Sequence, residues 1–382
     1  MSRIRIIVFS SYTKPYYSGS GLNALSLAKQ LKICGNKVSI LTYNWNCREK
    51  FLDSIDGLNV VRIPFFSKLH LIKFFGRVYL ALMLPLFLIV LRLKYKQLIV
   101  YGAFPGYLLL IVFAKVFAFK IVFRSTMLGS DDVLTLTINS IIRKLIFSKI
   151  DYYYATTPVF KKYFLQAFPN AKAKVFLATP GVDVNIYNTT AKGLKSSSDS
   201  PSTLTIISVG NLIPRKGYED IFNELSKLKF SFKYLVLGAE RRVDHFNWHS
   251  DITMQCIKEK GIKLLGSKIE FVGWTDDVLS YLERSDILIL NSKSEGLPNA
   301  LLEAMACGVV PVTRKIEGLS NYLLVNNENS FEFSNPQKIV DILYELNENS
   351  KLLNKLSFNA RSTVVNSFSF SRAIKQITNV LS

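Results

Sequence analysis

Two glutamates, Glu295 and Glu303, lie in a segment whose residue types suit the binding of a phosphate and of the hydroxyl groups beside it. The segment follows an apolar strand candidate, Ile287–Leu290, and continues into a helix for which Pro298 is the predicted first residue. The free N–H groups of residues 296–300 would then favour an anion. Ionised carboxylates beside that anion would accept hydrogen bonds from sugar or ribose hydroxyls. The spacing alone is equally compatible with a capping glutamate and a solvated helical glutamate.

A second candidate segment carries two adjacent cations, Arg215 and Lys216. They follow the strand candidate Leu204–Val209 in a Gly- and Pro-containing turn that ends at Gly217. Both side chains are long enough to provide counter-charges for the same phosphate. By itself this turn is equally compatible with two cations facing solvent.

The cysteines and histidines form no metal-binding pattern. The four cysteines are far apart with no Cys-x-x-Cys pair, which argues against a disulfide framework or a structural zinc site and favours a reducing compartment. His245 and His249 are four positions apart, but no glutamate follows the first of them as a zinc-protease helix requires. We interpret both as surface or loop residues, and we expect no metal and no cofactor.

Alternating strand and helix patterns surround both segments. Continuous apolar runs predict strands at residues 4–10, 38–42, 97–101, 120–123 and 152–156, and again at residues 204–209, 232–237, 269–272 and 287–290. Apolar residues at spacings of three and four predict helices at 22–31 and 218–228, the first preceded by a turn-rich loop over residues 14–21. This alternation is typical of parallel sheets with helices on both faces.

The length of 382 residues suggests two domains. A Ser-, Gly- and Pro-rich stretch predicts a linker at 188–202, between a first domain at 1–187 and a second at 203–367. We expect a C-terminal helix at 368–382 to join the first domain. The predicted fold class is α/β, with two facing Rossmann-like doubly wound domains and a ligand cleft between them.

Positive charge is concentrated in the first half of the chain. Residues 1–200 carry 27 Lys and Arg against 8 Asp and Glu, whereas residues 201–382 carry 21 against 20. The most apolar window, residues 78–91, is bounded by Arg77 and Arg92 and is shorter than the ~20 apolar residues that a spanning helix needs. Apolar residues with basic flanks are typical of a protein resting on an anionic membrane, and equally of a buried helix with charged ends.

Together these segments resemble the large family of retaining glycosyltransferases built from two Rossmann-like domains (GT-B, family 4-like, glycosyl transferases group 1), which includes bacterial polysaccharide and lipopolysaccharide enzymes. The E-x7-E element of that family corresponds to Glu295 and Glu303. Residues 209–217 resemble its phosphate-binding turn. Residues 180–183 resemble the end of its first domain, and residues 271–275 the strand whose turn meets the nucleotide base.

The resemblance implies a role for each matching residue. Lys216 would bind the donor diphosphate and Glu295 would contact the transferred sugar, so both are expected catalytic residues. Glu303 would bind the ribose. The other implied donor-binding positions are Gly19, Gly21, Asn211, Arg215, Trp274, Thr275, Gly296, Leu297, Pro298 and Asn299. The resemblance implies catalysis without a metal, because cations and helix N-termini stabilise the leaving diphosphate.

The chain departs from the family pattern at two places. Asn211 stands where many members have an arginine in the phosphate-binding turn. Where many members have a histidine after a first-domain strand, this chain has a segment from Arg124 to Asp132. Arg124, Asp131 and Asp132 therefore become candidates for contact with the acceptor or the donor sugar. The aspartate pair is equally compatible with a helix N-cap.

The sequence thus predicts a cytoplasmic enzyme associated with the inner face of the cell membrane. It would move a hexose from a UDP- or GDP-sugar to a glycan or lipid-linked glycan in bacterial surface polysaccharide, lipopolysaccharide or O-antigen biosynthesis. We expect an anionic membrane surface as a partner. We expect no nucleic acid, because the basic residues interleave with aliphatic runs and no nucleic-acid-binding motif is present. The alternatives are a nucleotide-sugar epimerase of the same architecture and an inactive member that acts as a scaffold.

Overall fold

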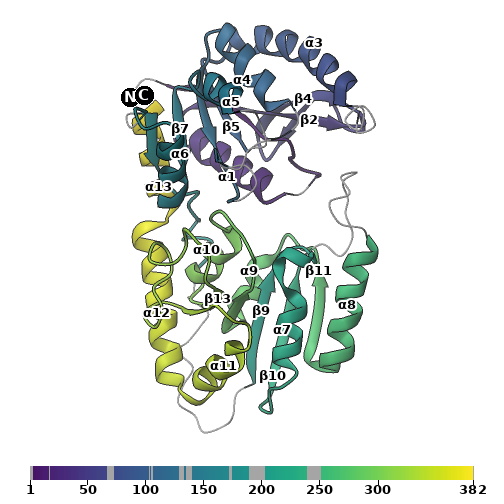
Figure 1. The fold of residues 1–382 in the computed structure, drawn as a ribbon, viewed down its shortest axis with the longest axis vertical. Coiled ribbons are helices and arrows are strands. Elements are labelled where there is room, and N and C mark those ends of the chain that lie inside the picture. Colours follow the sequence, from purple (N-terminus) through teal and green to yellow (C-terminus); the bar gives the residue numbers. More distant parts are fainter. Residues whose placement is uncertain are drawn as a thin grey trace. The chain divides into compact units, whose positions relative to one another are not determined.

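The chain forms two α/β units (Figure 1). The computed structural model describes residues 3–16, 18–66, 73–102, 104, 106–128, 133–134, 140–171, 174–188, 203–238 and 251–381. Within these residues, unit 1 runs to Pro180 and resumes at Ala373, and unit 2 runs from Gly181 to Arg372. None of the described helices has both the length and the apolar character needed to cross a membrane.

Unit 1 is built on a sheet that has eight strands in the described residues, in the order β3-β4-β2-β1-β5-β6-β7-β8. The strands are β1 (Arg5–Phe9), β2 (Lys37–Trp45), β3 (Leu52–Ile55), β4 (Leu58–Phe65), β5 (Gln97–Tyr101), β6 (Lys120–Arg124), β7 (Tyr152–Ala155) and β8 (Val175–Leu177). Neighbouring strands are parallel except in the β3–β4 hairpin. The carboxyl ends of the parallel strands therefore share one edge of the sheet.

Two helical layers cover the two faces of this sheet, because successive side chains of a strand point to opposite faces. Ile6 and Val8 pack against the layer of α1 (Gly19–Ile33) and α13 (Phe370–Leu381). Ile7 and Phe9 pack against the other layer. That layer consists of α3 (Lys73–Arg92), α4 (Tyr107–Val116), α5 (Ser140–Phe147) and α6 (Pro158–Ala167).

Unit 2 has a parallel sheet whose described strands follow the order β11-β10-β9-β12-β13-β14. The strands are β9 (Leu204–Val209), β10 (Phe232–Leu237), β11 (Ile269–Gly273), β12 (Ile287–Leu290), β13 (Val310–Arg314) and β14 (Phe331–Phe333). One face packs against α7 (Tyr218–Leu225), α8 (Asp251–Leu265) and α11 (Lys338–Glu348). The other packs against α9 (Val278–Glu283), α10 (Asn299–Ala306) and α12 (Ser350–Ser367).

The predicted fold class, two Rossmann-like α/β domains with parallel sheets, is confirmed. Strands β5, β9, β10 and β12 have the predicted bounds. The β3–β4 hairpin and strands β8, β13 and β14 were not predicted. Strand β13 contains Pro311, and β8 and β14 have three residues each, so none of them forms a long uninterrupted apolar run. Helix α7 ends at Leu225, three residues before the predicted end.

Candidate active site

The two segments singled out in the sequence follow neighbouring strands of unit 2. Strand β9 pairs in parallel with β12, with Ile206 opposite Ile287, so both strands end at the same edge of the sheet. The turn after β9 includes the short 3-10 helix Pro214–Lys216, and the loop after β12 leads into α10. The N–H of Lys293 donates to the carbonyl oxygen of Arg215 at 2.9 Å, which ties the loop to the turn.

Lys216, Arg215 and Glu295 form an ion cluster at this edge. The Nζ atom of Lys216 lies 2.7 Å from Oε1 of Glu295, and Nη1 of Arg215 lies 3.2 Å from the same oxygen. Arg215 also donates to the carbonyl oxygen of Ser294. Burial alone raises the pKa of the Glu295 carboxyl, but the two cations more than offset this effect and hold the pKa below its usual range. The cluster therefore presents an ionised carboxylate between two cations.

Two residues without predicted roles shape the turn beneath the cluster. Gly217 has a φ of +65°, and a Cβ atom there would lie 2.5 Å from Nδ2 of Asn291. The Asn291 side chain uses this space: its amide donates to the carbonyl oxygen of Gly217 at 2.9 Å, and its carbonyl oxygen accepts from Nε of Arg314 at 2.9 Å. Asn291 therefore fixes the distance between the β9 turn and the end of β12.

Helix α10 begins at Asn299, so the prediction that Pro298 is the first helical residue is wrong by one position. Pro298 has an extended backbone (φ −69°, ψ 129°) and serves as the N-cap, with no side-chain capping bond. The extended ψ carries the loop away from the helix axis, which is the ordinary conformation of an N-cap residue. Gly296 is buried, and Leu297 packs in the core of unit 2. The Oδ1 atom of Asn299 is buried and has no hydrogen-bond partner among the described residues.

Glu303 lies on α10 and is partly buried. Burial raises the pKa of its carboxyl to about 7, although a hydrogen bond with Tyr187 lowers it. Tyr187 belongs to the segment of unit 2 that precedes β9, and the sequence analysis did not single it out. The interpretation of Glu303 as a solvated helical glutamate is therefore wrong, because tertiary contacts remove much of its carboxyl from water.

The remaining donor candidates of unit 2 lie at the same edge of the sheet. Asn211 follows β9 and is exposed. Trp274 and Thr275 follow β11, which β10 separates from β9. Trp274 is exposed, and the Thr275 hydroxyl accepts from the N–H of Asp277 at 3.0 Å, so it also stabilises its own turn. The structure therefore brings Lys216, Arg215 and Glu295 into direct contact and leaves the β11 turn two strands away.

In unit 1 the glycine loop predicted at residues 14–21 ends at Ser18, because Gly19 and Gly21 lie in the first turn of α1. The hydroxyl of Ser18 accepts from the N–H of Gly21 at 2.9 Å and caps the helix. A Cβ atom on Gly21 would lie 2.4 Å from the carbonyl oxygen of Tyr12. Gly21 thus permits close contact between α1 and the loop that leads into it, whereas a Cβ atom on Gly19 would have no atom within 4 Å.

Arg124 ends strand β6 and is buried. Its guanidinium carbon lies 4.5 Å from the ring centre of Tyr101 and 4.9 Å from that of Tyr154. Such placement over aromatic faces stabilises a buried guanidinium. The other acceptor candidates, Asp131 and Asp132, lie outside the described residues.

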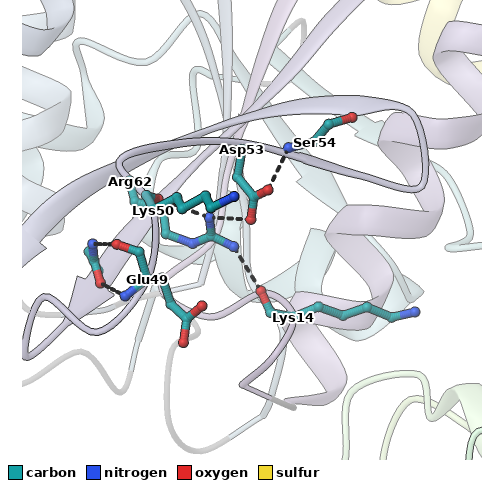
Figure 2. Close-up of polar contacts among 7 residues, drawn as sticks. Lys14, Glu49, Lys50, Asp53, Ser54 and Arg62 are labelled. Carbon is teal, nitrogen blue, oxygen red and sulfur yellow. Dashed lines mark hydrogen bonds and ion pairs between the residues drawn. The ribbon is translucent and has the colours of Figure 1, made fainter.

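A buried arginine that the sequence analysis missed holds the loop before α1 (Figure 2). Arg62 on β4 is 1% exposed, and its Nη1 atom lies 2.7 Å from Oδ2 of Asp53 and 3.1 Å from the carbonyl oxygen of Lys50. Its Nη2 atom donates to the carbonyl oxygen of Lys14 at 3.0 Å. The hydrogen bond from Arg62 lowers the pKa of Asp53. The only sequence signal for the structural role of Arg62 was its position as a single cation inside an apolar run.

Part of the chain matches a family of known proteins. Residues 194–363 match the family described as glycosyl transferases group 1. The matched residues include the ion cluster, Asn291 and Glu303. Among the described residues no group of three or more His, Cys, Asp or Glu side chains is placed to hold a metal ion.

Two relatives with similar sequences carry glycosyltransferase names, and a solved structure with the same fold contains UDP-glucose. An uncharacterized glycosyltransferase of Methanocaldococcus jannaschii is 25% identical over 248 residues, which is 63% of this chain and 60% of that protein. The UDP-Gal:alpha-D-GlcNAc-diphosphoundecaprenol alpha-1,3-galactosyltransferase of Escherichia coli is 30% identical over 118 residues, 30% of each chain. The chain thus spans less than two thirds of either relative. The Anabaena protein HepE, solved in complex with UDP-glucose, has the same fold, with a TM-score of 0.76, 15% identity and 99% of both chains covered.

Proposed function

We propose that this protein is a retaining glycosyltransferase, a hexosyltransferase that moves a sugar from a nucleoside diphosphate sugar to an acceptor hydroxyl. The observation that carries the proposal is the Lys216–Arg215–Glu295 cluster at the ends of two adjacent parallel strands. Ligands of doubly wound sheets bind at such strand ends. In this cluster an anion and sugar hydroxyls would find cations and an ionised carboxylate side by side.

In the proposed mechanism Lys216 and Arg215 contact the diphosphate, and the N–H groups of Gly296, Leu297 and Asn299 hold its distal phosphate. The bond between sugar C1 and the diphosphate oxygen breaks, while a bond from the acceptor oxygen forms on the same face of the sugar. The proton of the acceptor hydroxyl passes to the departing diphosphate oxygen. Cations already in place stabilise the negative charge that develops on the diphosphate. Donor binding therefore draws Lys216 away from Glu295, whose carboxylate then accepts hydrogen bonds from the sugar hydroxyls.

Further donor contacts complete the proposed site. Glu303 binds the ribose hydroxyls, and the exposed Trp274 with Thr275 lies beside the base. Asn211 takes the place of a third cation at the diphosphate. The carboxamide oxygen of Asn299, which has no partner among the described residues, accepts from a donor hydroxyl. Gly19 and Gly21 stay the donor-binding candidates of unit 1, and Arg124 stays its candidate for the acceptor or the donor sugar.

The proposed donor is a UDP- or GDP-sugar, and the proposed acceptor is a lipid-linked glycan in bacterial surface polysaccharide biosynthesis. The solved Anabaena protein with this fold was crystallised with UDP-glucose, and the name of the Escherichia coli relative specifies a diphosphoundecaprenol acceptor. Such an acceptor resides in a membrane, and the basic first half of the chain suits an anionic membrane surface. We place the enzyme on the cytoplasmic side, where its exposed free cysteines stay reduced.

A donor-binding experiment tests the proposal. The purified protein is heated with a panel of UDP- and GDP-sugars without metal, because a ligand of the folded state must raise the unfolding temperature. Lys216→Ala should weaken binding of the stabilising donor by about tenfold to a hundredfold, the effect of one charged hydrogen bond. Lys351→Ala, an exposed lysine of α12, is the matched control and should leave binding unchanged. Equal affinity of wild type and Lys216→Ala would contradict the proposed role of the cluster.

A further inference from the structure

The outward face of helix α3 is apolar. Among its described side chains, the exposed ones from position 78 onward are Val78, Leu82, Leu86, Ile89 and Val90, and Leu93 follows the helix at 81% exposure. All but Val90 recur at spacings of three and four residues, so they form one stripe along the helix. The opposite face, with Leu80, Leu84, Leu88 and Leu91, is buried in the core of unit 1. A surface helix of a water-soluble protein ordinarily has polar residues on its outward face.

The apolar surface continues onto the neighbouring helices of the same layer. Helix α4 lies beside α3 in unit 1 (Figure 1), and its Val112 and Val116 are exposed. Helix α5 packs next to α4 and exposes Leu145. We call this set the α3–α5 surface: Val78, Leu82, Leu86, Ile89, Val90, Leu93, Val112, Val116 and Leu145. Exposed apolar surfaces of this kind mark an interaction site.

The charged side chains of α3 and α4 are all cations, and Lys115 of α4 pairs with Asp151, which follows α5, at 2.8 Å. The sequence contains no Asp or Glu between residues 57 and 130, while the same stretch has ten Lys and Arg. Lys94 and Lys96 follow α3 directly, and Lys144 lies on α5; all three are exposed. An apolar surface with cations at its border is complementary to a bilayer, which offers acyl chains beneath anionic headgroups.

We propose that the α3–α5 surface docks unit 1 on an anionic phospholipid membrane. The aliphatic side chains of α3 enter the boundary between headgroups and acyl chains, and the lysines at its border contact lipid phosphates. Helix α3 lies along the bilayer, because its other face is occupied by the protein core. The proposal rests on the membrane location given in the proposed function and adds the face that makes the contact.

The composition of the surface favours a bilayer over a protein partner. Protein interfaces are enriched in Tyr, Trp and Arg at their centres, whereas Leu and Val are under-represented among the residues that dominate binding. The α3–α5 surface consists of Val, Leu and Ile, and Phe75 in the first turn of α3 is exposed beside it. A fluid acyl layer adapts to such side chains without the shape complementarity that a rigid partner needs.

The experiment measures sedimentation of the full chain with vesicles. One set contains phosphatidylcholine alone, and the other contains about one third phosphatidylglycerol, which supplies the anionic surface. Leu82→Gln with Leu86→Gln removes two exposed leucines and should weaken binding to the anionic vesicles on the order of tenfold to a hundredfold. Lys94→Gln with Lys96→Gln should weaken it about fivefold for each lysine and reduce its salt dependence.

Matched controls come from exposed residues of unit 2. Ile262→Gln with Phe358→Gln removes two exposed apolar side chains of α8 and α12, and Lys351→Gln with Lys355→Gln removes two exposed cations of α12. Both controls should bind vesicles like the wild type. The proposal is overturned if the wild type binds neither kind of vesicle, or if the leucine variant binds as tightly as the wild type. A wild-type dimer that the leucine variant dissociates, without vesicle binding, would assign the surface to a second copy of the chain.

A second measurement separates this proposal from the proposed function. The thermal shift with UDP-glucose and GDP-mannose is recorded for the same variants. If the Leu82→Gln, Leu86→Gln variant keeps its thermal shift with a nucleotide sugar, it is folded. Its loss of vesicle binding is then not caused by unfolding. Vesicle binding without any nucleotide-sugar binding in the wild type would overturn the donor site alone. Nucleotide-sugar binding without vesicle binding would overturn the docking surface alone.

Discussion

Glu303 should make the affinity for the donor depend on pH in the neutral range. Its carboxyl has a pKa of about 7 in the folded chain, because burial on α10 outweighs the hydrogen bond with Tyr187. Only the ionised carboxylate accepts hydrogen bonds with both oxygens from ribose hydroxyls. With this pKa, roughly one tenth of the molecules are ionised at pH 6 and roughly nine tenths at pH 8. Affinity should therefore fall about tenfold per pH unit below neutrality and level off above it.

The same group should affect stability in the opposite direction. The folded pKa of about 7 lies above the ordinary value of 4.5, so the folded state holds the proton more tightly. This contribution to stability is fully present below pH 4.5 and is lost as the pH rises through 7. The difference between the two values corresponds to about 3 kcal/mol. Raising the pH should thus strengthen donor binding while it weakens unit 2.

Glu303→Gln is the decisive variant, because glutamine keeps the shape of the side chain and does not titrate. Donor affinity is measured by calorimetry between about pH 5.5 and 8.5 with a nucleotide sugar, since the terminal phosphate of a free nucleotide itself titrates near pH 6. Stability is read from hydrogen exchange of the α10 amides, which reports on unit 2 without assuming two-state unfolding of the whole chain. Glu328→Gln, an exposed glutamate of unit 2, is the control.

In Glu303→Gln the affinity should be lower at pH 8 and independent of pH, and the α10 amides should exchange more slowly at pH 8 than in the wild type. The control should retain both pH dependences. A wild-type affinity that is flat or that falls with rising pH would refute the proposed role at the ribose. An unchanged pH dependence in Glu303→Gln would assign the titration to another group.

Three further substitutions test the site and its supports. Glu295→Gln should lower turnover at least about a hundredfold, with the fold retained by circular dichroism, because it replaces a charged acceptor of the sugar hydroxyls with a neutral amide. Wild-type turnover would remove Glu295 from the mechanism. Gly238→Ala should destabilise unit 2 by about 2–4 kcal/mol. Gly238 has a φ of +155°, and the Cβ atom of an alanine there would lie 2.1 Å from the carbonyl oxygen of Gly210. Equal unfolding temperatures of the variant and the wild type would contradict this prediction. Arg62→Met should destabilise unit 1 by about 3 kcal/mol, because Asp53 and two backbone carbonyl groups lose the hydrogen bonds that Arg62 donates. An unchanged urea unfolding curve would show that the buried guanidinium is dispensable.

Much of the fold could be predicted because parallel strands buried on both faces are continuous apolar runs. Strands β9 and β12 have the bounds that their hydrophobic runs indicate. The two segments after them were also recognisable, since Arg215, Lys216 and Glu295 are polar residues directly after buried strands. These features are local: a run of residues and the turn that ends it determine them.

Helix α3 shows where periodicity stops being informative. Its residues are apolar on all sides, so the sequence pattern could not distinguish the face that Leu84 and Leu88 bury from the face that Leu82 and Leu86 expose. The choice follows from the sheet against which the helix packs. Glu303 is a second example, because the sequence identified the residue but not its pKa. Burial in the folded chain raises that pKa, and the hydrogen bond with Tyr187 only partly offsets the effect.

The sequence by itself determined the strands that are continuous apolar runs, the amphipathic helices after β1 and β9, and the residue types at the strand ends, because backbone preferences and hydrophobic periodicity act over a few neighbouring positions. The tertiary structure decided which strand ends meet. Lys216 contacts Glu295 because β9 pairs on one side with β12, a strand distant in the chain, and on the other side with its chain neighbour β10. Arg62 on β4 donates to Lys14 in the loop before α1 as well as to Asp53 on the neighbouring strand β3. Contacts between such distant segments depend on strand order and side-chain packing, which no local pattern encodes.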